Sequence, residues 1–271
     1  MAKTYEEIIS MKHKPRVLVL KTDGINCDEE LYYAFKLAGG DPKIVHINEL
    51  RSRQENLQHF QILAIPGGFS YGDDIVSGKI LAVELTSFFS ESLKQFIQRK
   101  DTLTIGICNG FQALIRTGIL PFGNIAKMDA TLTYNDSGHF ECRWVSLKID
   151  HNSSCVFLNN LKGEKVSYQV AHGEGKFFAS PKNLDTIEKK NLVVLRYISD
   201  DEPTQKYPAN PNGSLNAIAG ITDPTGRVLG LMPHPERFVK VEQHPNWRRI
   251  KRSKPEGLPL FVNMIEYAKG L

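Results

Sequence analysis

A single cysteine stands between two glycines near the middle of the chain. Cys108 follows Gly106 by two positions and precedes Gly110 by two. An apolar, β-rich run comes before it and a helical pattern comes after it. This arrangement is typical of a nucleophile elbow, a sharp turn between a strand and a helix that needs residues without bulk on both sides. Such a turn would hold the Cys108 sulfur clear of the sheet.

The helix that follows this turn would add chemistry of its own. Its N-terminal N–H groups and the positive end of its dipole would point at the Cys108 sulfur and favour the thiolate. The backbone amide of Asn109 would be placed to bind an oxyanion that forms beside the sulfur. The motif is short, however, and an isolated cysteine is more often a small core residue. The nucleophile hypothesis therefore needs a second part.

A histidine and a glutamate about 125 residues downstream supply that part. His234 stands between Pro233 and Pro235, which stiffen the backbone around it, and Glu236 follows two residues later. A histidine can take the proton of the cysteine, and a carboxylate can orient and stabilise the charged ring. We therefore predict a catalytic triad of Cys108, His234 and Glu236. The alternative is a surface histidine in a proline-rich turn.

A glycine-rich loop over residues 66–73 is the third candidate part of the site. It directly follows an apolar run, and glycines let backbone N–H groups face a ligand closely. Ligands of open parallel sheets collect at the carboxyl ends of the strands, so one cleft could hold this loop, the elbow and His234. We predict that the Gly68 amide is the second oxyanion donor. The loop lacks the G-K-[ST] ending of a phosphate loop.

Cys27 is the rival nucleophile. It opens a predicted helix, which would lower its pKa, but Asp28, Glu29 and Glu30 surround it with negative charge and oppose that shift. A structural role is the better hypothesis for Cys27.

The elements that must position these residues follow two patterns. Strand-like apolar runs fall at residues 16–20, 43–47, 62–65 and 103–107, and helical stripes at 28–38 and 82–99. Strands that alternate with helices predict a parallel sheet wrapped by helices. From about residue 130 the pattern changes to strands at 145–149, 166–170 and 193–197, and to a hairpin over 216–232. We therefore expect an α/β fold: a mostly parallel open sheet flanked by helices, with an antiparallel β addition.

Length and composition restrict the class of protein. The chain has 271 residues and a net charge of +4, which does not favour a nucleic-acid partner. Its four cysteines form no C-x-x-C motif, so we expect no metal site and no disulfide framework. No signal peptide or membrane-spanning run is recognisable, so we expect no membrane partner and a cytoplasmic location. We expect an extension over residues 1–14 and one domain over 15–271, with a basic insertion at 240–257 and a closing helix at 258–271.

These motifs together resemble the triad class of glutamine amidotransferases. The resemblance is stronger still to the glutaminase subunits of phosphoribosylformylglycinamidine synthase, and it covers most of residues 16–237. The segments that carry it are residues 26–28, 66–73, 106–112, 135–144, 171–175 and 233–237. It implies a flavodoxin-like fold and the amidotransferase type 1 domain.

The resemblance also implies roles for individual residues. Cys108 would attack the side-chain carbonyl of L-glutamine and form a γ-glutamyl thioester, with His234 moving the proton and Glu236 holding His234. Gly68 and Asn109 would bind the oxyanion. The residues expected to contact glutamine are Phe69, Gln112, His172 and Glu174.

The family further implies a partner. Ammonia would pass to a separate synthetase subunit, which converts formylglycinamide ribonucleotide to the amidine in purine biosynthesis. ATP and Mg²⁺ belong to that partner, so we expect no cofactor in this chain. Whether a small accessory subunit is also needed stays open. The competing hypotheses are another Cys-His-Glu hydrolase, such as a stand-alone amidase or a peptidase, and a non-catalytic binding relative.

Overall fold

The computed structural model describes residues 14–158, 160–249 and 254–270. Most of the expected N-terminal extension and part of the basic insertion lie outside these ranges. The division into an extension over 1–14 and one domain over 15–271 therefore stays a prediction.

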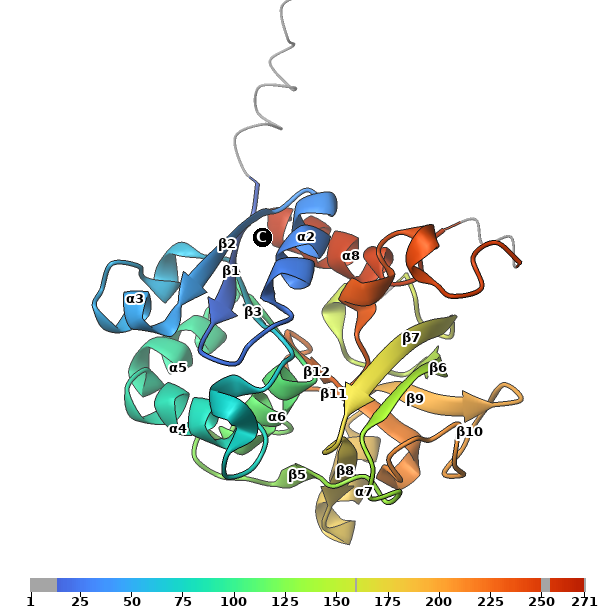
Figure 1. The fold of residues 1–271 in the computed structure, drawn as a ribbon. Helices are drawn as coiled ribbons and strands as arrows, with labels where there is room; N and C mark the ends of the chain where they lie inside the picture. Colours follow the sequence, from blue (N-terminus) through green and yellow to red (C-terminus); the bar gives the residue numbers. More distant parts are fainter. Residues whose placement is uncertain (1–13, 159, 250–253, 271) are drawn as a thin grey trace, which may run out of the picture.

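One large sheet runs through the molecule, and half of it is parallel (Figure 1). Neighbouring strands of this half all run in the same direction. In spatial order they are β2 (Asp41–His46), β1 (Arg16–Lys21), β3 (Ile62–Ile65), β4 (Leu103–Ile107) and β12 (Val228–Leu231). The central strands β3, β4 and β12 are buried along their whole length, as their sequences predict, since Thr104 is their single polar residue.

The other half of the sheet is antiparallel and continues from β12. Its strands, again in spatial order, are β11 (Ile218–Thr222), β9 (Val193–Ser199), β6 (Glu141–Ile149) and β7 (Lys165–His172), and the short β10 (Glu202–Pro203) pairs with β9. A separate pair is formed by β5 (Ala130–Thr133) and β8 (Lys176–Ala179). The expected fold class, a parallel sheet with an antiparallel addition, is confirmed.

Helices cover both faces of the parallel half (Figure 1). On one face α2 (Asp28–Leu37) packs on α8 (Leu258–Lys269), where the rings of Phe35 and Phe261 meet edge to face at 5.1 Å. On the other face α4 packs on α6. The remaining bounds are α3 (Ile47–Arg51), α4 (Lys79–Ser87), α5 (Ser90–Gln98), α6 (Asn109–Arg116) and α7 (Pro181–Lys189). None of the helices within the described ranges has the length and apolar character needed to cross a membrane.

The single helix expected over residues 82–99 is two helices. The chain leaves helical geometry at Phe89, whose φ is −119° and ψ is 10°. Serines at 87 and 90 flank the break, and serine favours helix ends because its hydroxyl competes for backbone groups. The break lets α4 pack on α6 while α5 packs on a 3₁₀ turn, η1 (Leu57–His59).

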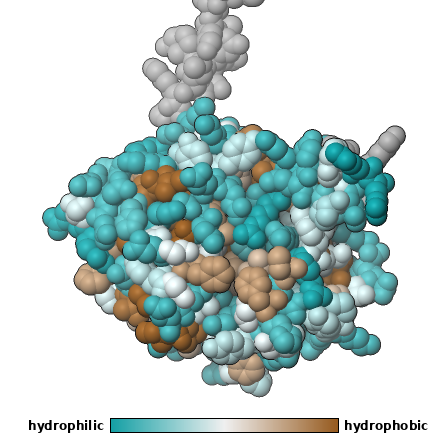
Figure 2. Space-filling view, in the orientation of Figure 1, coloured by the Kyte–Doolittle hydropathy of each residue, from teal (hydrophilic) through white to brown (hydrophobic). Residues whose placement is uncertain are grey.

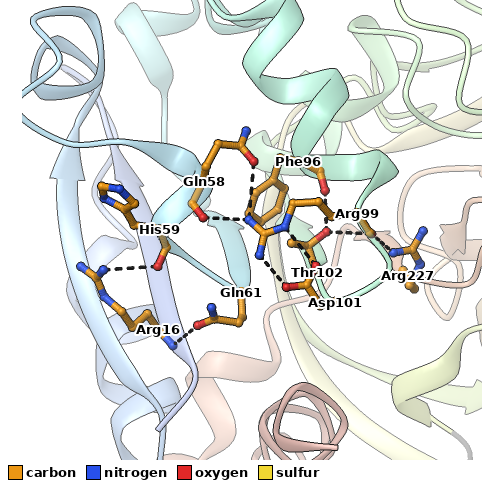
Figure 3. Close-up of polar contacts among 9 residues, drawn as sticks. All are labelled: Arg16, Gln58, His59, Gln61, Phe96, Arg99, Asp101, Thr102 and Arg227. Carbon is orange, nitrogen blue, oxygen red and sulfur yellow. Dashed lines mark hydrogen bonds and ion pairs between the residues drawn. The ribbon is translucent and has the colours of Figure 1, made fainter. Parts of the chain in front are cut away.

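A polar clasp joins the amino ends of the parallel strands (Figure 3). The Arg99 guanidinium donates to the Gln58 carbonyl at 2.8 Å and forms two bonds to the Asp101 carboxylate. The Arg227 guanidinium donates to the Arg99 carbonyl. These residues precede β3, β4 and β12. The clasp therefore fixes the amino ends of three strands, and the elbow lies at the opposite, carboxyl end of β4.

Candidate active site

The elbow predicted at Cys108 is present between β4 and α6. Cys108 has φ 52° and ψ −106°, a conformation that is costly for a residue with a side chain and is most often kept at functional sites. A side chain on Gly110 would stand 2.0 Å from the Ile65 carbonyl oxygen, and one on Gly106 would stand 2.6 Å from the Gly110 carbonyl oxygen. The turn therefore needs glycine at both positions.

The predicted base and its carboxylate form a buried pair. Nδ1 of His234 lies 2.5 Å from Oε1 of Glu236, and both side chains are 1% exposed. His234 follows β12, and its backbone N–H donates to the Gln169 carbonyl of β7 at 2.8 Å. Glu236 lies in the 3₁₀ turn η5 (Pro235–Phe238), which carries it back beneath the ring. The pair is thus held between the two halves of the sheet.

Pairing of β4 with β12 brings the cysteine to the histidine. The Cys108 N–H donates to the Leu231 carbonyl at 2.8 Å, three residues before His234. A side chain on Gly67 would stand 2.8 Å from Cε1 of His234 and 3.3 Å from Cβ of Cys108. The glycine loop, the elbow and the His234 loop therefore meet at one point. Cys108 is 5% exposed, and its thiol points to the Ala171 carbonyl at 3.7 Å.

The pKa values of the two histidines near this point are shifted in opposite directions. Burial would lower the pKa of His234, but the Glu236 carboxylate and Cys108 together raise it to about 10. Burial and the charge of His234 lower the pKa of His172 to about 3. His234 is therefore suited to carry a proton beside Cys108, whereas His172 stays neutral.

The two backbone amides predicted to bind an oxyanion are those of Gly68 and Asn109. Gly68 has φ +130°, and a side chain there would stand 2.7 Å from the Asn26 nitrogen. The Gly68 amide donates no hydrogen bond to any residue that the structure describes. Asn109 is the first residue of α6, so its amide has no acceptor within the helix.

The side chain of Asn109 adds a contact that the sequence did not reveal. Its oxygen accepts from the Ser70 N–H at 3.3 Å, and its nitrogen donates to the Asp73 carboxylate at 2.9 Å. The same nitrogen donates to the Gln112 side-chain oxygen at 3.0 Å. Asp73 stood within the glycine-rich motif, but only the fold places it against the elbow.

The residues expected around glutamine differ in how free their polar atoms are. The Gln112 amide nitrogen donates to the Glu174 carbonyl at 2.5 Å, so both ends of its side-chain amide are occupied. The Glu174 carboxylate lies 3.8 Å from the Arg116 guanidinium. The Phe69 ring is 45% exposed and lies 6.4 Å from the Phe140 ring. Figure 2 shows one face of the molecule, which is largely hydrophilic with separate hydrophobic patches.

His172 is enclosed by two asparagines. Its Nδ1 lies 3.1 Å from the side-chain oxygen of Asn135, and its Nε2 lies 3.5 Å from the side-chain nitrogen of Asn212. A neutral ring with its proton on Nδ1 satisfies both contacts. The Asn135 side chain also donates to the His172 carbonyl at 2.7 Å, so it shapes the end of β7 beside Cys108.

Cys27 lies close to the triad but is poorly suited to be a nucleophile. It is 2% exposed, and burial followed by the charge of Glu236 raises the pKa of its thiol. Arg237 donates to the Cys27 sulfur at 3.1 Å and to the Glu30 carboxylate at 2.8 Å. Cys27, Glu30, His234 and Glu236 each offer a ligand atom within 4.8 Å of the others. Because Arg237 already supplies a positive charge there, the expectation of no metal site stays unchanged.

The fold and this arrangement are those of a glutamine amidotransferase. A family model described as the CobB/CobQ-like glutamine amidotransferase domain matches residues 14–268. The chain is 46% identical over 257 residues to the phosphoribosylformylglycinamidine synthase subunit PurQ of Dehalococcoides mccartyi, covering 94% of this chain and 98% of that one. The subunit PurQ of Treponema denticola is 42% identical over 258 residues, covering 89% and 94%. The chain therefore belongs to the family of glutamine amidotransferases that includes these PurQ subunits.

A solved structure supports the same relationship. The structure of PurLQS from Thermotoga maritima contains a chain that matches with a TM-score of 0.71 at 31% identity, covering 94% of this chain and 99% of that one. The expected resemblance to glutaminase subunits is confirmed. The roles of the individual site residues stay predictions.

Proposed function

We propose that the chain hydrolyses L-glutamine to glutamate and ammonia as the glutaminase of a phosphoribosylformylglycinamidine synthase. The observation that carries this proposal is the meeting of Cys108, in its strained elbow, with the buried pair of His234 and Glu236. The relatives named as PurQ subunits support the assignment to phosphoribosylformylglycinamidine synthase in particular.

The chemistry begins with Cys108. Its thiolate attacks the side-chain carbon of glutamine, and the negative charge that develops on oxygen is bound by the amides of Gly68 and Asn109. His234 gives its proton to the departing ammonia and then takes a proton from the water that hydrolyses the thioester. Glu236 holds the ring and stabilises its charged form.

The substrate is proposed to lie between the glycine loop and the end of β7. Glu174 offers a carboxylate that suits the α-ammonium group of glutamine, and Phe69 would cover the substrate from the solvent side. Gln112 and His172 would hold the residues around the substrate in place, since their polar atoms already bind Glu174, Asn135 and Asn212.

The ammonia is proposed to pass to a synthetase subunit, which binds ATP and Mg²⁺. A relative named as a subunit and a match within PurLQS support a partner of this kind. An accessory subunit is proposed as a further component of the complex. A cytoplasmic location is also proposed, because a reducing compartment keeps the Cys108 thiol free.

The test is ammonia release from glutamine by the purified chain and by Cys108→Ala, each with and without the synthetase. We expect release that requires Cys108 and increases with the partner. Release that survives Cys108→Ala would overturn the elbow assignment. Turnover of peptides without turnover of glutamine would favour the alternative hydrolase, although a cysteine that is 5% exposed does not suit a peptide substrate.

A further inference from the structure

A group of acidic and ligating side chains includes two members of the proposed triad. Cys27 and Glu30 come from the start of α2, and His234 and Glu236 come from the loop after β12. One ligand atom from each lies within 4.8 Å of the others, and three of the four residues are buried. The Glu236 side chain is buried, whereas that of Glu30 is 36% exposed. Two carboxylates this close repel each other, and a positive charge beside them offsets that repulsion, most of all for the buried one.

Arg237 places its guanidinium in this group. Its Nε donates to Oε1 of Glu30 at 2.8 Å, and one Nη donates to the Cys27 sulfur at 3.1 Å. The other Nη reaches the side-chain oxygen of Gln169 at 3.5 Å. Burial would lower the pKa of Arg237, but Glu30, Cys27 and Glu236 raise it, so the guanidinium stays charged.

These contacts join three elements around the triad. Arg237 lies in η5, next to Glu236, while its partners lie on α2 and β7. The Gln169 carbonyl on β7 also accepts the N–H of His234. Within the described residues, Oε2 of Glu236 is buried without a hydrogen-bond partner, so the position of Glu236 depends on its bond to His234 and on the contacts that its neighbour Arg237 makes.

We infer that Arg237 is a positioning residue of the triad, which fixes the His234 loop against α2 through Glu30 and Cys27. This inference rests on the proposed function, and it assigns Cys27 a role as hydrogen-bond acceptor. Three diverging contacts suit the planar fork of a guanidinium and cannot all be made by an ammonium group.

The test compares Arg237→Met and Arg237→Lys with the unchanged chain in complex with its synthetase. We expect kcat for glutamine hydrolysis to fall by up to about 100-fold in Arg237→Met with a much smaller change in KM, because the base is misplaced while the substrate site is intact. Added guanidinium ion restores part of kcat in Arg237→Met. Arg237→Lys keeps the charge without the fork and falls between the two.

Arg196→Met is the matched control. Arg196 lies on β9 and is also partly buried. Its guanidinium bonds two carboxylates, those of Asp150 and Glu188, and none of the triad residues. It is expected to lose stability without a guanidinium-dependent change in kcat. A kcat in Arg237→Met within about twofold of the unchanged chain, or a loss that guanidinium does not restore, would overturn the inference.

A second measurement separates this inference from the proposed function. The rate at which iodoacetamide alkylates Cys108, followed by peptide mass spectrometry, reports the cysteine–histidine pair without any need for glutamine. We expect slower alkylation in Arg237→Met, and an unchanged rate contradicts the inference. If the unchanged chain fails to hydrolyse glutamine, the proposed function fails while this comparison still decides. Should Arg237→Met not fold, Glu30→Gln, which removes one anchor of the guanidinium, must show a smaller effect in the same direction.

Discussion

The side-chain amide of Asn109 donates to the carboxylate of Asp73 at 2.9 Å, and this bond joins the elbow to the glycine loop. The Asn109 oxygen accepts from the Ser70 N–H at 3.3 Å, two residues after Gly68. Asp73 itself has φ 53° and also accepts from the Gly78 N–H at 3.2 Å. One side chain therefore sets the position of both proposed oxyanion donors relative to each other.

Asp73→Ala is expected to lower kcat more than it raises KM. The side-chain nitrogen of Asn109 would lose one of its two acceptors, and the Gly68 donor would move relative to the elbow. The loss should stay below the roughly 10²–10³-fold that removal of a whole oxyanion donor costs. Glutamine hydrolysis checks this, with Asp74→Ala, an exposed neighbour, as control. Equal kcat values for the two variants would contradict a role for the Asp73 contact.

Gly110→Ala is expected to destabilise the fold by about 3 kcal/mol or more, at the upper end of what added bulk in a packed interior costs. The new methyl group would stand 2.0 Å from the backbone oxygen of Ile65, which cannot rotate away. Gly270→Ala is the matched control, since its nearest contact would be an ordinary 3.5 Å. Urea denaturation measures both. A midpoint for Gly110→Ala close to that of the control would show that the elbow tolerates a side chain.

Stability is expected to fall as the pH rises from 6.5 through 10, because of His234. The folded chain holds the His234 proton up to a pKa of about 10, whereas the unfolded chain releases it near 6.5. The stabilisation is therefore complete below pH 6.5 and lost above 10. The ionisable groups near the ring are Glu236, Cys108, His172, Cys27 and Glu30. Urea denaturation across this range should give a flatter profile for Glu236→Gln. Parallel profiles would contradict the coupling.

His172 is expected to make the free energy of unfolding fall toward acid pH, whereas His234 makes it fall toward alkaline pH. Its folded pKa of about 3 lies below the unfolded value of 6.5, so the unfolded chain binds a proton that the folded chain refuses. Stability should therefore fall as the pH drops from 6.5 toward 3. His172→Gln is expected to lose less stability between pH 7 and pH 4.5 than the unchanged chain does. The exposed His139→Gln is the control and should behave as the unchanged chain.

Much of this architecture follows from local patterns. The runs at 62–65 and 103–107 are apolar except for Thr104, which is typical of strands buried on both faces. The glycines at 106 and 110 predict the elbow because no other residue fits such a turn. These features can be predicted from residues that are neighbours in the sequence.

Features that depend on distant contacts were not predicted. The break at Phe89 exists because α4 and α5 pack on different partners. The bond from Asn109 to Asp73 joins residues 36 positions apart, and that from Arg237 to Cys27 joins residues 210 positions apart. No local pattern carries such pairings, so the sequence predicts the members of the proposed triad but not the residues that support them.

The order of the strands along the chain also has a consequence during synthesis. Cys108 emerges with β4, but its neighbour in the sheet, β12, and His234 follow about 125 residues later. A ribosome adds roughly 5–20 residues per second, so this interval lasts on the order of ten seconds. Throughout it the nascent polypeptide carries the proposed nucleophile without its base. The unfinished chain therefore does not hydrolyse glutamine, and hydrolysis begins only after β12 has paired with β4 and brought His234 to Cys108.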